Sequence, residues 1–225
     1  YDEEIYIVDF SYKRHEILAL REVNKLVMVL DHHESAANEL IGLPQCVFDM
    51  NHSGAMLAWM HLHPQVGPPD YVRYVEDRDL WKWQLEASRE YNAALASIPM
   101  TFESWDQYIF TQATNDIIKE GTAVLRYQKQ EIERQLSRPI GDIWFGETKI
   151  PCINTTTMIS EIGNRLCKPF ACMYQIIDSE RVTLSLRSVG DANCIPLAKL
   201  YGGGGHKNAA SCKVPFNQFK EMVRW

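Results

Sequence analysis

The sequence has no Cys-x-x-Cys pair, although it contains six cysteines. Structural zinc sites and dithiol redox motifs use closely spaced cysteines, so neither kind of site is predicted. We expect free, mostly buried thiols in a reducing compartment. The thiols belong to Cys46, Cys152, Cys167, Cys172, Cys194 and Cys212.

The sequence also lacks a long apolar run and an excess of positive charge. No segment approaches the ~20 apolar residues that span a bilayer, and no signal-peptide pattern opens the chain. We therefore expect a soluble cytoplasmic protein without membrane partners. The net charge of -6 argues against a broad basic surface for long duplex nucleic acid. A polyanionic substrate would need local positive charge, from metal ions or from a few Arg and Lys residues.

The composition that remains is that of an ordinary folded protein, 46% hydrophobic and 23% charged. The 225 residues leave the number of domains open. Residues 5–10 and 26–30 are continuous apolar strands on either side of a helical pattern at 13–24, and 46–48 is a short third strand. Strand, helix and strand in succession predict a parallel α/β sheet. Because its first strand begins so close to residue 1, we expect an earlier strand of the sheet to be missing from this chain.

Downstream, Ser53 is positioned to cap a helix. Apolar residues recur at helical spacing from 102 to 136, which predicts one or two long helices. Strand-like runs reappear after the turn residues 137–142, at 143–145, 171–177 and 182–186. We therefore predict two domains, an N-terminal parallel-sheet domain at 1–100 and a smaller α/β domain at 140–225, joined by a helical connector at 101–139.

Polar residues end both strands of the predicted βαβ unit. Asp9 closes the first strand, and Asp31 closes the second and is followed at once by His32 and His33. Ligands of open α/β sheets bind beyond the carboxyl ends of the strands. Carboxylate oxygen together with imidazole nitrogen suits Mn, Fe, Co or Zn. The pattern indicates a metal site at this edge of the sheet.

The triplet Asp31-His32-His33 resembles the signature of the DHH superfamily of phosphoesterases. IVDF, around Asp9, resembles the second acidic motif of that family, and VEDRDLW at 75–81 resembles its fourth. YGGGGHKNAAS at 201–211 resembles the glycine-rich motif of the associated C-terminal domain, which is found in RecJ-like exonucleases, nanoRNases and exopolyphosphatase-related proteins. The motifs recur in the expected order across nearly the whole chain.

The resemblance implies two divalent ions, usually Mn, with Mg or Co as other possibilities. By motif match, Asp9 bridges the two ions while His32 and Asp77 bind one of them. Asp79 is the competing choice, because VEDRD holds two aspartates. Asp31 orients its neighbours, and His33 faces the scissile phosphate, where it stabilises charge or protonates the leaving oxygen.

The first motif of the family, an Asp-rich turn after the first strand, is absent from this chain. Only half of a dinuclear site is therefore visible. We expect the native protein to be longer, and this chain to bind metal poorly or with a single ion.

The glycine run has a physical interpretation of its own. Gly202, Gly203, Gly204 and Gly205 offer unobstructed backbone N–H groups and permit positive φ, so the main chain can surround an anionic oxygen. We predict a phosphate-binding loop here, to which His206, Lys207 and Arg187 add donors and charge. We further expect the small residues 208–211 to open a helix.

Other candidate residues have a structural and a functional interpretation. His52 either caps a helix or faces the substrate. The aromatic side chains of this region either stack on bases or belong to the core: Tyr71, Tyr74, Trp81 and Trp83.

The expected function is phosphodiester hydrolysis of short oligonucleotides or small nucleotides by a metal-activated hydroxide. One alternative keeps the metal and changes the substrate to polyphosphate or pyrophosphate. The other alternative is a nucleotide-binding module whose catalysis is lost or impaired along with the first motif. The sequence does not predict the oligomeric state.

Overall fold

The computed structural model describes residues 1–224, and the chain divides into two compact units. The first unit is Tyr1–Gln128 and the second begins at Lys129. The division falls within helix α7 (Thr114–Leu136), inside the segment 101–139 that we predicted as a connector. Residues 1–224 contain no helix with the length and hydropathy of a membrane span.

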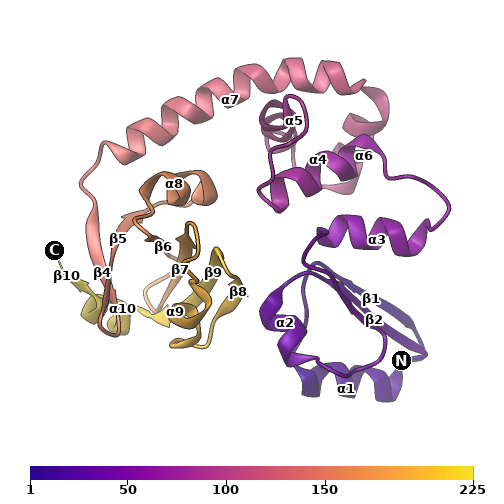
Figure 1. Cartoon of the computed structure of the whole chain (residues 1–225), viewed down its shortest axis with the longest axis horizontal. Helices are drawn as coiled ribbons and strands as arrows, with labels where there is room; N and C mark the ends of the chain where they lie inside the picture. The colour runs from indigo at the N-terminus through magenta and orange to yellow at the C-terminus, as the bar shows by residue number, and fades with distance from the viewer. Residues whose placement is uncertain (225) are drawn as a thin grey trace. The chain divides into compact units, whose positions relative to one another are not determined.

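The first unit holds a sheet of three parallel strands in the order β1-β2-β3 (Figure 1). The parallel α/β arrangement predicted for this half of the chain is confirmed. The strands and their connecting helices are β1 (Glu4–Val8), α1 (Arg14–Val23), β2 (Leu26–Asp31), α2 (Glu34–Glu39) and β3 (Cys46–Phe48).

The two faces of this sheet are covered by different helices. The register places Ile7 beside Val29, and both side chains pack with Ile17 of α1 in one buried cluster. Helix α3 (Gly54–Leu62) lies over the opposite face, as Figure 1 shows. Its start agrees with the prediction, because the Ser53 hydroxyl accepts a hydrogen bond from the Met56 backbone N–H at 3.1 Å.

The remaining helices of the first unit form a separate core around Tyr91 and Ile117. They follow one another after α3 without an intervening strand. Their bounds are α4 (Asp70–Asp79), α5 (Ser88–Leu95) and α6 (Phe102–Thr111), followed by α7. Tyr74 stacks on Tyr91 with ring centroids 4.1 Å apart, so this tyrosine belongs to the core rather than to a base-stacking surface.

The second unit holds a mixed sheet of seven strands, in the order β10-β4-β5-β6-β7-β9-β8. Among the strand pairs of residues 141–224, only β5–β6 is parallel. The strands are β4 (Gly141–Phe145), β5 (Thr148–Asn154), β6 (Phe170–Ile176), β7 (Arg181–Ser188), β8 (Gly204–His206), β9 (Ala209–Pro215) and β10 (Val223–Arg224). The helices are α8 (Ile159–Leu166), α9 (Ile195–Lys199) and α10 (Phe216–Met222).

Successive side chains of the central strands pack alternately into two hydrophobic cores, one on each face of this sheet. Cys172 packs in a cluster that includes Phe219 of α10, whereas its neighbour Met173 packs with Ile162 of α8 and Ile132 of α7. This is the period of two that a β-strand imposes on its side chains.

Three predicted strands of this half match β4, β6 and β7, but the helix predicted to open at 208–211 is wrong. Strand β9 begins at Ala209. Its buried residues Ala210, Cys212 and Val214 alternate with exposed ones. That period of two outweighs the small size of the first residues, which had favoured a helix.

Candidate metal centre

Two of the predicted metal-site residues, Asp9 and Asp31, lie at the same edge of the parallel sheet. Val8 pairs with Leu30, so the residues that follow them, Asp9 and Asp31, stand at the same level. The Asp9 N–H donates to the Leu30 carbonyl at 3.0 Å. Asp9 has φ +65°, a left-handed conformation that carries a strain for a residue with a side chain. Such a conformation persists where the surrounding structure fixes the residue.

The His32 imidazole lies between two carboxylates. Its Nε2 atom is 3.1 Å from Asp9 Oδ1 and 3.3 Å from Asp79 Oδ2. One ligand atom from each of the three residues lies within 4.8 Å of the others, close enough to share one cation. His32 itself is buried, with 2% of its surface exposed. The strand ends of β1 and β2 and the last turn of α4 therefore supply a three-residue group.

The structure brings Asp79 to this group and not Asp77, which had been the motif-based choice. Both carboxylate oxygens of Asp77 accept backbone hydrogen bonds, from Gln84 N–H at 2.8 Å and from Leu85 N–H at 3.3 Å. Asp77 is buried and holds the loop that follows α4. The geometry therefore favours Asp79 over the predicted Asp77 as the partner of Asp9 and His32, and their role as metal ligands stays a prediction.

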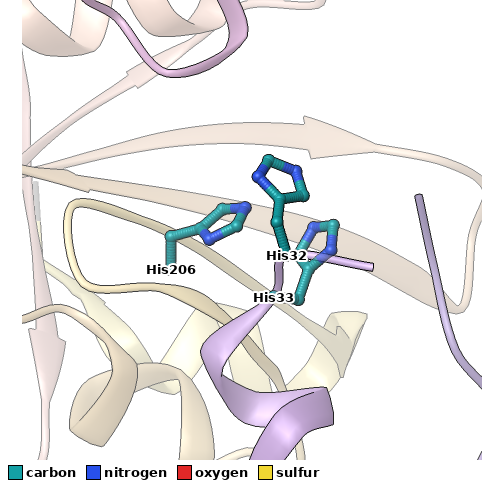
Figure 2. A group of neighbouring side chains, drawn as sticks. All are labelled: His32, His33 and His206. Atoms are coloured by element: carbon teal, nitrogen blue, oxygen red, sulfur yellow. The ribbon is translucent and has the colours of Figure 1, made fainter. Parts of the chain in front are cut away.

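Asp31 orients the two histidines that follow it. Its Oδ1 atom accepts hydrogen bonds from the His32 and His33 backbone N–H groups, at 2.8 and 3.3 Å, and lies 2.7 Å from His33 Nδ1. Figure 2 shows the two imidazoles leaving neighbouring backbone positions just before α2; the same view draws His206, from the second unit. The arrangement agrees with the orienting role that the resemblance implies for Asp31.

The charges of these groups shift one another's pKa values. Burial by itself lowers the pKa of His32, but the hydrogen bond to Asp9 and the charge of Asp79 outweigh it and raise that pKa above its usual value. Burial raises the pKa of Asp79, and the nearby charge of Asp9 adds to this effect. Burial also raises the pKa of Asp31, but its contacts with His33 leave that pKa lower than usual. Positive charge is therefore favoured at His32, between the carboxylates.

The residues present suit a divalent cation. Two carboxylates and one imidazole form a donor set typical of Mn, Fe, Co or Zn. In addition, Asp31 is fully buried, and its Oδ2 atom has no hydrogen-bond partner among residues 1–224. Burying a carboxylate oxygen without a partner costs folding free energy unless a bound ligand supplies the missing interaction. Asp31 forms a second possible group with Asp9 and His33, so Asp9 is common to both groups.

In the second unit, the glycine loop belongs largely to a β-hairpin. Residues Gly204–His206 form β8 and pair with β9. Gly202 and Gly205 have positive φ, +71° and +138°, as the prediction for this loop required. A Cβ atom on Gly203 would lie 2.0 Å from the Ser211 carbonyl oxygen, so close strand packing also demands glycine there.

The basic residues of this unit have local partners. The Arg187 guanidinium donates to the Ser160 hydroxyl from Nε at 3.3 Å and from Nη2 at 2.9 Å. Burial lowers the pKa of Arg187. Lys207 is exposed, with Nζ 3.5 Å from Asp191 Oδ1. The phosphate-binding role of this loop stays a prediction.

Comparison with known proteins finds sequence relatives along most of the chain. It is 27% identical over 221 residues to the uncharacterized protein R106 of Acanthamoeba polyphaga mimivirus, which covers 93% of this chain and 52% of that protein. It is 24% identical over 226 residues to oligoribonuclease NrnB of Bacillus subtilis, a DHH-family protein, covering 88% of this chain and 55% of NrnB. The resemblance to the DHH superfamily is confirmed. The chain spans about half the length of these curated relatives.

No family model matches the chain. Among solved structures, a pGpG-specific phosphodiesterase from Vibrio, PggH, is 12% identical with a TM-score of 0.46, covering 98% of this chain and 96% of that one. An exopolyphosphatase-related protein from Bacteroides fragilis is 17% identical with a TM-score of 0.43, covering 93% and 66%.

Sequence reasoning missed two residues near the candidate metal site. Gly54, the first residue of α3, lies against Asp9. Glu76, one helical turn before Asp79 on α4, accepts a hydrogen bond from Ser53 N–H and lies 3.1 Å from His52 Nδ1. The spacing of Glu76 and Asp79 within VEDRD was the available signal, because residues three apart share a helix face. The cap of α3 is Ser53 and not His52, whose ring instead contacts Glu76.

Proposed function

We propose that the chain is a metal-dependent phosphoesterase that hydrolyses phosphodiester bonds in short oligonucleotides or small nucleotides. The observation that carries the proposal is the meeting of Asp9, His32 and Asp79 at the carboxyl edge of the parallel sheet. The sequence match to an oligoribonuclease supports nucleotide substrates. The acidic net charge supports short substrates rather than long duplexes.

The three residues of the site would hold a divalent ion, with Mn expected and Mg or Co as alternatives. When bound, the ion supplies Lewis-acid chemistry, acidifying water and neutralising charge that develops on phosphoryl oxygens. The proposed role of Asp9 extends to a second ion, because Asp9 belongs to both possible ligand groups.

The DHH triplet supplies the other proposed catalytic groups. Asp31 fixes the His33 ring through its Nδ1 atom, so the other nitrogen, Nε2, is the one offered to substrate. His33 then stabilises charge on the scissile phosphate or protonates the leaving oxygen. Asp31 holds the His33 ring in position for either role.

The second unit would bind a phosphate group of the substrate. In this proposal the backbone of Gly202–Gly205 and the side chains of His206, Lys207 and Arg187 supply the donors. The support is the positive φ of Gly202 and Gly205 and the fixed guanidinium of Arg187. Replacing His206 with alanine should mainly raise KM, and a loss of kcat at unchanged KM would contradict this assignment.

The test is a substrate panel given to the 225-residue chain with Mn, and again with a chelator. The panel holds di- to pentanucleotides, cyclic dinucleotides, pyrophosphate and inorganic polyphosphate. We expect Mn-dependent cleavage of the short nucleotides and none with chelator. Cleavage of inorganic chains alone would identify an exopolyphosphatase or pyrophosphatase instead. Nucleotide binding without turnover would identify a binding module.

A further inference from the structure

We propose that Gly54 is a positioning residue for the metal site, since only a residue without a side chain leaves Asp9 where it meets His32. The inference deepens the proposed function and rests on it. Gly54 opens α3, and its contact with Asp9 joins the first turn of that helix to the end of β1.

The contact between the two residues leaves no room for a side chain. A Cβ atom added to Gly54 would lie 2.4 Å from Asp9 Cβ, 2.5 Å from Asp9 Oδ1 and 2.7 Å from Asp9 Cα. Such distances lie far inside van der Waals contact, at about 3.5–4.0 Å between carbons. Any residue larger than glycine must therefore displace either the start of α3 or Asp9.

The start of α3 is anchored and resists displacement. Ser53 caps the helix by accepting from Met56 N–H, and its own N–H donates to Glu76 Oε2 at 2.9 Å. The same carboxylate oxygen lies 3.1 Å from His52 Nδ1. The Glu76 side chain is 12% exposed, so little solvent competes with these contacts.

Asp9 is displaced more easily than the start of α3. One backbone hydrogen bond, to Leu30, fixes its main chain, but its side chain is about half exposed. A shift of the Asp9 carboxylate would open its 3.1 Å approach to His32 Nε2. Glu76 therefore acts with Gly54: it anchors α3 against α4, the helix that also carries Asp79.

The experiment measures the dissociation constant of Mn for four chains by calorimetry: wild type, Gly54→Ala, Glu76→Ala and the double variant. We expect Gly54→Ala to weaken Mn binding by about 10- to 100-fold, the range found when a group that orients a metal ligand is lost. In the Glu76→Ala background, α3 is released, so the same substitution should have a smaller effect. Gly67→Ala is the matched control, because a Cβ there meets nothing within 4 Å.

A second arm uses the thermal unfolding of metal-free protein and remains informative if Gly54→Ala folds poorly. Asp9→Gly removes two of the three crowding atoms, so Gly54→Ala should lower Tm less in that background than in wild type. Equal losses of Tm in both backgrounds, or unchanged Mn affinity in folded Gly54→Ala, would overturn the inference. A wild-type chain that binds no Mn would instead contradict the proposed function, while this arm would still decide whether Gly54 crowds Asp9.

Discussion

The strand ends of the first unit and the glycine loop of the second unit each carry a recognisable sequence motif, but the two motifs use different chemical groups. In the first unit the candidate groups are side chains: two carboxylates and an imidazole, from the residues that follow β1 and β2 and from α4. In the second unit the predicted groups are mostly backbone N–H groups of a loop that runs into β8.

The difference shows how far packing alone explains each motif. Asp9 and Asp79 both approach one histidine, and like charges this close oppose folding unless a protonated His32 or a bound cation offsets them. Packing therefore gives no reason for the first group, whereas it gives a full reason for Gly203. A positive charge between the carboxylates, on His32 or on a bound cation, is the physical explanation for the first unit, and the glycine run by itself does not require a ligand.

The sharpest test of this comparison substitutes the two aspartates of VEDRD separately. Asp79→Asn should abolish measurable metal-dependent turnover and weaken Mn binding by more than about 100-fold, because it removes a proposed ligand rather than a group that supports one. Its thermal stability without metal should not fall, since burial raises the pKa of Asp79 and the charge that the substitution removes therefore opposes folding.

Asp77→Asn should behave in the opposite way. It weakens the hydrogen bonds to Gln84 and Leu85, each worth about 1.5–3 kcal/mol when the acceptor is charged, so stability should fall. Urea unfolding and Mn titration of both variants measure the contrast. Loss of Mn binding in Asp77→Asn with no change in Asp79→Asn would restore the motif-based assignment.

The next test asks whether the glycines of the loop serve packing. Gly203→Ala forces a Cβ against the backbone of β9, with Ser211 O at 2.0 Å and Cys212 Cα at 2.9 Å. Overpacking of this kind costs about 1–3 kcal/mol or more. A Cβ atom on Gly202 would meet nothing within 4 Å. Gly202→Ala should therefore lose only the conformational cost of φ +71°, about 1 kcal/mol of unfolding free energy. Equal losses of unfolding free energy would mean that packing does not distinguish the two positions.

The sequence allowed the parallel sheet and the meeting of its strand-end residues to be predicted, because both depend on local patterns. The continuous apolar runs that end at Asp9 and Asp31 can be recognised in the sequence itself. Parallel strands then bring their carboxyl ends together at one edge of the sheet. The cap at Ser53 is equally local, since its partner Met56 lies three residues away.

What could not be predicted depends on which face of an element meets its neighbour. Asp77 and Asp79 both lie in the last turn of α4, and only the packing of that helix decides which one reaches His32. Gly54 is similar, because its contact with Asp9 joins residues 45 positions apart in the sequence. Strand β9 was missed because its first residues are small, while its partner strand β7 supplies the pairing.

The smallest expected effect concerns the exposed charge beside the loop. Lys207→Ala should raise KM for a short oligonucleotide by about threefold at low salt, and the effect should vanish near 1 M salt, where the screening length is about 3 Å. Stability should not change, because the exposed pair with Asp191 contributes little. Asp191→Ala is the control, since it removes the same pair but leaves the positive charge, and it should not raise KM. Similar KM values for Lys207→Ala and wild type at low salt would exclude Lys207 from phosphate binding and leave the loop with a purely structural role at this position.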